Sequence, residues 1–401
     1  MIKPKLSREL GVALLLFYGL GNILGAGIYV LIGKVASIAG YMSVASFLLS
    51  SIIAGFTAFS YIELASRYPV SAGEAVYVQE GFGKKYLSIS IGIFIAISGL
   101  VSVAALSHGF VGYLQEFINI NTYVALILVL AILVLISLAG IKQSIIAASV
   151  LTIIEIFGLL LIIFLGFDNI VNPTVEYTKF IPDIAASDIS LIFLGSFLAF
   201  YAFIGFEDMV NVAEEVKSPT TTYPKAIILA LIISTTLYFL IAVVAIQSLS
   251  LEQLSNSNAP FSDIYRQITG NDPILITVIG LFAVINGALI QLIMASRVVY
   301  GLAAKGWLPS ALSEISKKNN IPVKATIVVG IIALIFTLFL DLITLASITS
   351  LMILIIFTLV NLSLILIKRK TPNIDGIYIV PVWVPWCGVI LNTLLISVKL
   401  F

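Results

Sequence analysis

Long apolar segments dominate this sequence and leave few choices for its fold. Eleven of them are long enough, at about 17 residues or more, to cross a bilayer core as helices. They are Leu10–Ile32, Tyr41–Ser66, Leu87–Phe117, Tyr123–Ala139, Ser144–Phe167, Ser190–Val212, Ala226–Ser248, Pro273–Ala303, Val323–Leu340, Leu342–Ile367 and Ile377–Phe401. Since every backbone N–H and C=O group in hydrocarbon needs a partner within the protein, these segments predict helices. With 60% hydrophobic and 10% charged residues, residues 1–401 are expected to form one all-α integral membrane domain.

The distribution of positive charges predicts the orientation. When the N-terminus is placed in the cytoplasm, 17 of the 21 Lys and Arg residues fall on the cytoplasmic side. An excess of basic residues in cytoplasmic loops is the usual pattern of membrane proteins. We therefore expect a multi-pass protein of the cell membrane, in contact with the lipid bilayer, whose N-terminus is cytoplasmic. Eleven spans would leave the C-terminus outside.

Several classes of function are disfavoured by the residues that carry chemistry. The chain has one cysteine, Cys387, and one histidine, His108, so no disulfide, metal cluster or cofactor site is predicted. Lys84 and Lys85 follow a glycine, but the spacing and hydroxyl of a nucleotide-binding loop are missing. No nucleophile–base pair suggests an enzyme. A net charge of +1 without a basic arm gives no sign of nucleic-acid binding.

The first apolar segment contains an unusual run, Gly25-Ala26-Gly27-Ile28. Each glycine weakens a helix interior by about 1 kcal/mol relative to alanine, and this run lies where a membrane span should be strongest. One interpretation is a broken helix, whose freed amides and carbonyls bind substrate at the membrane midplane in secondary transporters. The other is a face of small residues for close helix packing.

The sixth segment repeats this feature. It contains Phe200-Tyr201-Ala202-Phe203-Ile204-Gly205-Phe206-Glu207, with small residues inside an apolar run and an acid directly after it. The first and sixth segments are five apart and enter the membrane from opposite sides. Two interrupted helices at equivalent places of two inverted halves indicate a transporter site. The pattern favours alternating access over a pore.

Five stretches then carry a resemblance to a known family. They are Gly25-Ala26-Gly27-Ile28-Tyr29-Val30; Glu63-Leu64-Ala65-Ser66-Arg67-Tyr68-Pro69 with Gly73 and Tyr77; Gly205-Phe206-Glu207 followed by Glu214-Glu215-Val216-Lys217-Ser218-Pro219; Ala259-Pro260-Phe261; and Ser296-Arg297-Val298-Val299-Tyr300-Gly301 through Gly306-Trp307-Leu308-Pro309. In this order they resemble the amino acid–polyamine–organocation (APC) superfamily of permeases, and within it the cationic-amino-acid-transporter-like branch. The stretches span residues 25–309, and the hydropathy match extends to about residue 367.

The resemblance implies the 5+5 inverted-repeat fold of the leucine-type sodium symporters, with discontinuous helices 1 and 6. The first repeat would occupy residues 10–167 and the second residues 190–367, followed by an accessory helix at 377–401. Many relatives have twelve spans, so the eleven counted here are a departure from the family pattern.

The chemistry of a zwitterionic amino acid suits the two breaks. The half-helix after Gly27 offers free amides and a positive dipole end to a carboxylate, and the broken sixth helix offers free carbonyls to an ammonium group. By resemblance, the substrate-binding residues are Gly25, Ala26, Gly27, Ile28, Phe200, Tyr201, Phe203 and Ser102. Tyr201 falls at the family's aromatic gate, although an aromatic residue in a membrane helix can also serve packing alone.

Glu155 is the most informative single residue. It lies eleven positions into the fifth segment, about 16 Å from its end and therefore near the membrane midplane. An acid at that depth costs several kcal/mol unless it is protonated or paired, so it indicates function. Many relatives carry a lysine at this position, and the lysine mechanism does not transfer to an acid. Three interpretations stay open: a proton-coupling carboxyl, a ligand of a cation, or a protonated acid that only joins helices.

Other polar residues add weaker candidates. Glu207, beside the second break, is a second proton-coupling candidate, or a structural partner of its neighbours. His108 could relay protons, but a hydrogen-bonded core histidine is the favoured interpretation. Asn286 and Gln291 are mid-membrane amides that could face the site. Near the cytoplasmic ends, Glu63, Arg67 and Arg297 are expected in salt bridges.

The substrate class is predicted from the third segment, which lacks an acidic residue at the relevant position. Close relatives can place a glutamate there to pair with a cationic side chain, whereas this chain has no acid between Ile97 and Ser102. Because a buried cation without a partner is costly, we expect neutral amino acids, carried by proton-coupled symport. The alternatives are an exchanger of amino acids or polyamines, including cationic ones, and an amino acid sensor that does not transport. The sequence says nothing of an accessory subunit.

Overall fold

The computed structural model describes residues 10–70, 73–139, 144–182, 186–316, 321–372 and 374–400. Within these residues the regular structure is helical, apart from one isolated parallel bridge between Leu10 and Val216. This agrees with the all-α class predicted from the apolar segments.

The helices follow the predicted segments. In the first half they are α1 (Val12–Ala26), α2 (Ile28–Ala39), the 3-10 turn η1 (Gly40–Met42), α3 (Ser43–Arg67), α4 (Gly73–Phe82), α5 (Lys85–Leu114), α6 (Thr122–Ala139), α7 (Ser144–Leu165) and α8 (Phe167–Val171). In the second half they are η2 (Tyr177–Phe180), α9 (Ala186–Ala199), η3 (Phe200–Phe203), η4 (Glu207–Glu215), α10 (Pro219–Ser248), α11 (Leu251–Asn256), α12 (Pro260–Thr269), α13 (Ile274–Ala304), η5 (Ser310–Ser313), α14 (Val323–Phe339), α15 (Leu342–Lys370) and α16 (Trp383–Leu400).

Seven helical stretches of the described chain are long and apolar enough to cross a membrane. They are Ile28–Arg67, Lys85–Leu114, Asp188–Ala213, Pro219–Ser248, Ile274–Ala304, Leu342–Lys370 and Trp383–Leu400. Four shorter apolar helices, Val12–Gly25, Thr122–Leu138, Ser149–Leu165 and Val323–Phe339, account for the other predicted segments. The chain is thus a membrane protein by composition and helix length, while the count of eleven spans stays a prediction.

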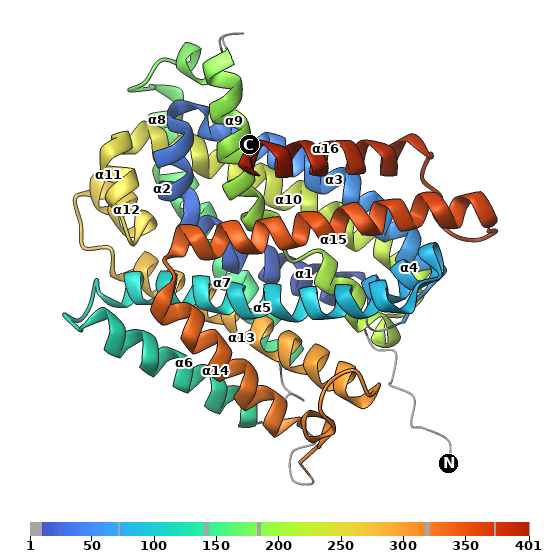
Figure 1. Cartoon of the computed structure of the whole chain (residues 1–401). Helices are drawn as coiled ribbons and strands as arrows, with labels where there is room; N and C mark the ends of the chain where they lie inside the picture. Colours follow the sequence, from blue (N-terminus) through green and yellow to red (C-terminus); the bar gives the residue numbers. More distant parts are fainter. Residues whose placement is uncertain are drawn as a thin grey trace.

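The centre of the molecule is built around α1, α5 and α13 (Figure 1). The long helix α5 packs against α13 on one side and α15 on the other, and α14 crosses it near one end. The interrupted α1 packs against α7, α10 and α13, so the predicted break lies inside the bundle. α16 lies along α15 and α3 at the edge, where its Trp383, Trp386 and Ile390 side chains are exposed, as expected for a lipid-facing helix.

Glu63 joins three elements at one end of the bundle. Its buried carboxylate accepts hydrogen bonds from Arg67 Nη2 at 2.6 Å and from Lys368 Nζ at 2.8 Å. It also accepts the backbone N–H of Val380 at 2.8 Å. These contacts connect α3, α15 and the segment that leads to α16. Glu63 and Arg67 were each expected in salt bridges, and they form one with each other, while Lys368 is a further partner that the sequence did not indicate. Arg297 was expected in a salt bridge as well but forms none among the described residues.

His108 lies where α5 meets the end of α14. Its Nε2 atom is 3.0 Å from the carbonyl oxygen of Thr337 and 3.1 Å from that of Leu340. The ring is therefore hydrogen bonded to backbone, as the structural interpretation predicted.

Candidate functional site at two helix breaks

The first break lies at Gly27. α1 ends at Ala26 and α2 begins at Ile28, while Gly27 between them has φ −105° and ψ −60°. The first amides of a helix have no acceptor in their own helix. Those of Val30 and Leu31 donate to the Gly27 carbonyl, at 3.3 and 2.9 Å, which leaves the amides of Ile28 and Tyr29 for the break. The side chain of Ala26 lies outside the described part of the chain, and its predicted role concerned the backbone only.

The second break spans Ile204 to Phe206. The 3-10 turn η3 ends at Phe203, Ile204 is extended, and Gly205 has φ +134°, a conformation that favours glycine. The Glu207 carboxylate accepts the N–H of Gly205 at 2.8 Å, so this acid supplies a hydrogen-bond partner that the broken helix leaves open. The aromatic side chains of Phe200, Tyr201 and Phe203 are buried around this turn.

The first break touches the η3 turn that leads into the second break. A Cβ atom placed on Gly27 would lie 2.1 Å from Ala202 Cα and 2.3 Å from Ala202 Cβ, which shows direct backbone contact. The Tyr238 hydroxyl, from α10, lies 2.7 Å from the Ile23 carbonyl oxygen and 2.9 Å from that of Ala202. One buried side chain thus contacts the polar backbone of both discontinuous helices.

Not every carbonyl predicted to bind an ammonium group is open in this state. The carbonyl oxygen of Tyr201 accepts the N–H of Ile204 at 3.2 Å, within the η3 turn. The carbonyl of Ala202, which the prediction omitted, is held by Tyr238. The carbonyls of Tyr201 and Ala202 thus both have a hydrogen-bond partner, the first because η3 closes as a 3-10 turn.

Tyr201 and Ser102 are brought together, although they are far apart in sequence. Their hydroxyl oxygens are 2.8 Å apart, and both side chains are buried between η3 and α5. The predicted gate residue is thus hydrogen bonded to another predicted substrate-binding residue.

Glu155 lies beside the first break. Its Oε1 atom accepts a 2.9 Å hydrogen bond from Asn286 Nδ2 of α13, and a Cβ atom on Gly25 would lie 3.4 Å from the same oxygen. Its Oε2 atom is buried and has no hydrogen-bond partner among the described residues. Tyr29, in the first turn of α2, donates to the Glu155 backbone carbonyl at 2.7 Å. The acid of α7 therefore contacts the end of α1 and is bonded to a neutral amide.

A second polar cluster was only partly anticipated. Asp208 accepts hydrogen bonds at one oxygen from Asn22 of α1 and from Gln291 Nε2 of α13, the latter at 3.0 Å. Gln291 also donates to Asn22 Oδ1 at 3.3 Å. Gln291 was a predicted amide of the site, whereas Asn22 was missed. The available signal was an amide in the middle of an apolar segment, three residues before the small-residue run.

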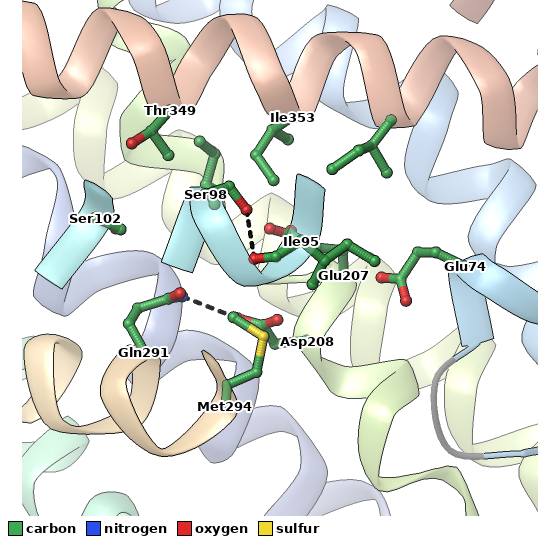
Figure 2. Close-up of a pocket in the computed structure, with 12 residues that line it drawn as sticks. Glu74, Ile95, Ser98, Ser102, Glu207, Asp208, Gln291, Met294, Thr349 and Ile353 are labelled. Carbon is green, nitrogen blue, oxygen red and sulfur yellow. Dashed lines mark hydrogen bonds between the residues drawn. The ribbon is translucent and has the colours of Figure 1, made fainter. Parts of the chain in front are cut away.

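A closed cavity lies next to this cluster, between α5, α13, α15, α4 and the second break (Figure 2). Ser102 and Glu207, both predicted site residues, line it, and so do Glu74, Asp208 and Gln291. It has room for about one water molecule. Of the predicted substrate-binding and proton-coupling residues that the structure describes, only Ser102 and Glu207 line it, so the cavity brings together a part of the predicted site, and Glu155, Gly27 and Tyr201 lie outside it.

Comparison with known proteins shows the family of the chain. A sequence model of the amino acid permeases matches residues 10–401, nearly the whole chain. The chain belongs to the amino acid permease family. This confirms the resemblance inferred from the five sequence stretches and the expectation that the protein is a transporter and not an enzyme.

Individual relatives of this amino acid permease carry different substrate names. The vacuolar cationic amino acid transporter 2 of Arabidopsis thaliana is 31% identical over 393 residues, 92% of this chain and 61% of the relative. The branched-chain amino acid permease BcaP of Bacillus subtilis is 28% identical over 404 residues, 94% of this chain and 85% of the relative. The methylthioribose transporter of Bacillus subtilis is 27% identical over 399 residues, 94% of this chain and 84% of the relative. The permease thus spans less than two thirds of the plant transporter's length.

Proposed function

We propose that this permease is a secondary active transporter that couples uptake of neutral amino acids to protons by alternating access. The observation that carries the proposal is a contact in the buried centre between the first break, at Gly27, and the η3 turn beside the second break, at Ala202. Amides of the first α2 turn suit the substrate carboxylate, and the open backbone of the second break suits the ammonium group. The cavity holds about one water molecule, so this conformation is closed and a substrate requires it to open.

The helix pairing supports the proposed 5+5 inverted repeat. If the third to fifth spans are α5, α6 and α7, their counterparts five spans later are α13, α14 and α15. α5 packs against α14, and its counterpart α13 packs against α6. Likewise, α5 packs against α15, and α13 packs against α7, so each contact has an equivalent in the other half. Two packed halves of this kind can rock against each other around a central site.

Proton coupling is proposed for Glu155 and Glu207. Each carboxyl is buried next to one of the breaks, and neither forms an ion pair among the described residues. A buried carboxylate without a cation is costly. Protonation of the acid therefore stabilises the closed state, and loss of the proton destabilises it. The protonation of either acid then depends on the opening of the site.

A second candidate function has a specific observation in its favour. Glu74, Glu207 and Asp208 all line the closed cavity, and Lys and Arg do not. Such a wall suits the cationic head of a basic amino acid or polyamine. The cationic exchanger therefore remains the alternative, while Ile95, Met294 and Ile353 of the same wall suit an apolar side chain.

The test is uptake of labelled amino acids into purified proteoliposomes with an inside-alkaline pH gradient and no sodium. We expect concentrative uptake of neutral amino acids that collapses with the gradient. Uptake only into preloaded vesicles, with basic amino acids preferred, would favour the exchanger. Substrate-induced thermal stabilisation without any flux would favour a sensor.

Tyr201→Ala should weaken substrate binding, because it removes the buried ring that η3 holds over the break and its bond to Ser102. Tyr201→Phe removes the hydroxyl alone, and one hydrogen bond is worth about 0.5–1.5 kcal/mol, a change of up to about tenfold. We expect KM of uptake to rise in the order wild type, Tyr201→Phe, Tyr201→Ala. Equal kinetics for all three proteins would contradict the gate.

Tyr238→Phe should slow transport, because the Tyr238 hydroxyl contacts carbonyls of both broken helices. Loss of this bond leaves two buried carbonyls with one partner fewer, and we expect the initial uptake rate to fall by up to about tenfold. Tyr86→Phe, at an exposed position of α5, is the matched control. An unchanged rate for Tyr238→Phe would show that this contact is not needed during the cycle.

A further inference from the structure

Three carboxyl groups share the wall of the closed cavity. Glu74 comes from α4, and Glu207 and Asp208 come from η4 (Figure 2). The rest of the wall consists of apolar side chains, hydroxyl groups and the Gln291 amide, without a basic residue. Three ionised carboxylates cannot remain this close in a low-dielectric interior, so the cavity must take up protons or another cation.

Glu74 differs from the other two acids in its bonding. Glu207 accepts the Gly205 N–H, and Asp208 accepts two side-chain amides. Among the described side chains, Glu74 has one weak contact, at Oε1, from the Tyr61 hydroxyl at 3.5 Å, and its carboxyl also accepts its own backbone N–H. Its Oε2 atom is buried and has no hydrogen-bond partner among the described residues. That oxygen is the one available to form a new O–H bond.

The neighbours of Glu74 leave it without a compensating charge. Tyr61 of α3, Tyr77 of its own helix and Tyr223 of α10 are phenols near it, and Asp208 and Glu207 are nearby acids of η4. The cavity-lining residues of α5 and α15 are not titratable. Lys370 of α15 donates instead to backbone carbonyls at the far end of α4. Burial, and then the charge of Asp208, raise the pKa of Glu74 to about 8.

We propose that Glu74 binds one proton and releases it on the cytoplasmic side in each transport cycle, through the cavity that it shares with Glu207 and Asp208. This inference rests on the proposed proton-coupled function. α4 follows α3 and precedes α5 at the end of the bundle that the charge distribution places in the cytoplasm. Opening the cavity there would hydrate Glu74 and stabilise its ionised form. The proton then leaves to cytoplasmic water, and the carboxylate is protonated again by a proton from the outside when the site is open to that side.

The test compares Glu74→Gln with Glu80→Gln, a change of an exposed acid on the same helix. Both are measured in proteoliposomes for pH-driven uptake, for exchange with preloaded substrate, and for proton influx reported by a pH-sensitive dye inside the vesicles. We expect Glu74→Gln to lose pH-driven accumulation and substrate-induced proton influx while exchange continues. Glu80→Gln should behave as wild type.

Wild-type pH-driven uptake with an unchanged pH profile in Glu74→Gln would overturn this inference and leave the proposed function intact. If the wild type itself shows no proton influx, the proposed proton-coupled function is wrong, whatever the result for Glu74→Gln. Loss of uptake that sodium or potassium restores would mean that the cavity binds a metal cation instead. Should Glu74→Gln not fold, Glu74→Asp keeps a carboxyl at a shifted position. Its pH profile should shift, and an identical profile would overturn the proposal.

Discussion

Gly27→Ala should nearly abolish transport. A Cβ atom at this position would lie 2.1 Å from Ala202 Cα, and that neighbour is backbone that cannot rotate away. Overpacking of this kind costs about 1–3 kcal/mol and sometimes more, so the first break and the η3 turn would have to separate. We expect the initial rate of uptake to fall by about tenfold or more, with a lower melting temperature of the purified protein.

Gly55→Ala is the matched control for this change. Gly55 lies inside α3, and a Cβ atom there would meet nothing within 4 Å. Alanine is also the better helix former, by about 1 kcal/mol, so this variant should fold and transport as wild type. If Gly27→Ala also transported at the wild-type rate, contact between the first break and the η3 turn would not be required for the cycle, and the main support for the proposed site would be lost.

Glu155→Gln should uncouple uptake from the pH gradient. Glutamine has nearly the same shape and keeps an oxygen for the bond from Asn286, but it cannot bind or release a proton. We expect gradient-driven accumulation to fall to the level without a gradient, while exchange between preloaded and external substrate continues. The measurement is uptake at matched substrate concentration with and without the gradient. Glu252→Gln, an exposed acid of α11, is the control.

The result also separates the three interpretations of Glu155. Retained gradient dependence in Glu155→Gln would show that the acid only joins α7 to α13. Uptake by the wild type that requires sodium, and a variant that no longer responds to sodium, would assign Glu155 to cation binding. Proton-driven uptake by the wild type that is lost in the variant would support coupling.

Helix ends were less predictable than helix positions. The first segment was expected to end at Ile32, but α2 continues to Ala39. Lys34 interrupts the apolar run in the sequence, whereas in the structure its Nζ atom donates to the carbonyls of Ser255 and Ser257, at 2.9 Å and 3.2 Å. These partners lie at the end of α11, at its residue Ser255 and at Ser257 directly after it, which no hydropathy pattern near Lys34 could reveal.

The sequence by itself determined the membrane class, the helical segments, the two weak points at Gly27 and Gly205, and the family. These properties depend on local composition, because a bilayer demands long apolar helices and glycine weakens them wherever it stands. Only the tertiary structure decided which polar groups meet. It paired Asp208 with Asn22 and placed Glu74 in the same cavity, since such contacts join residues far apart in the chain and depend on how the helices pack.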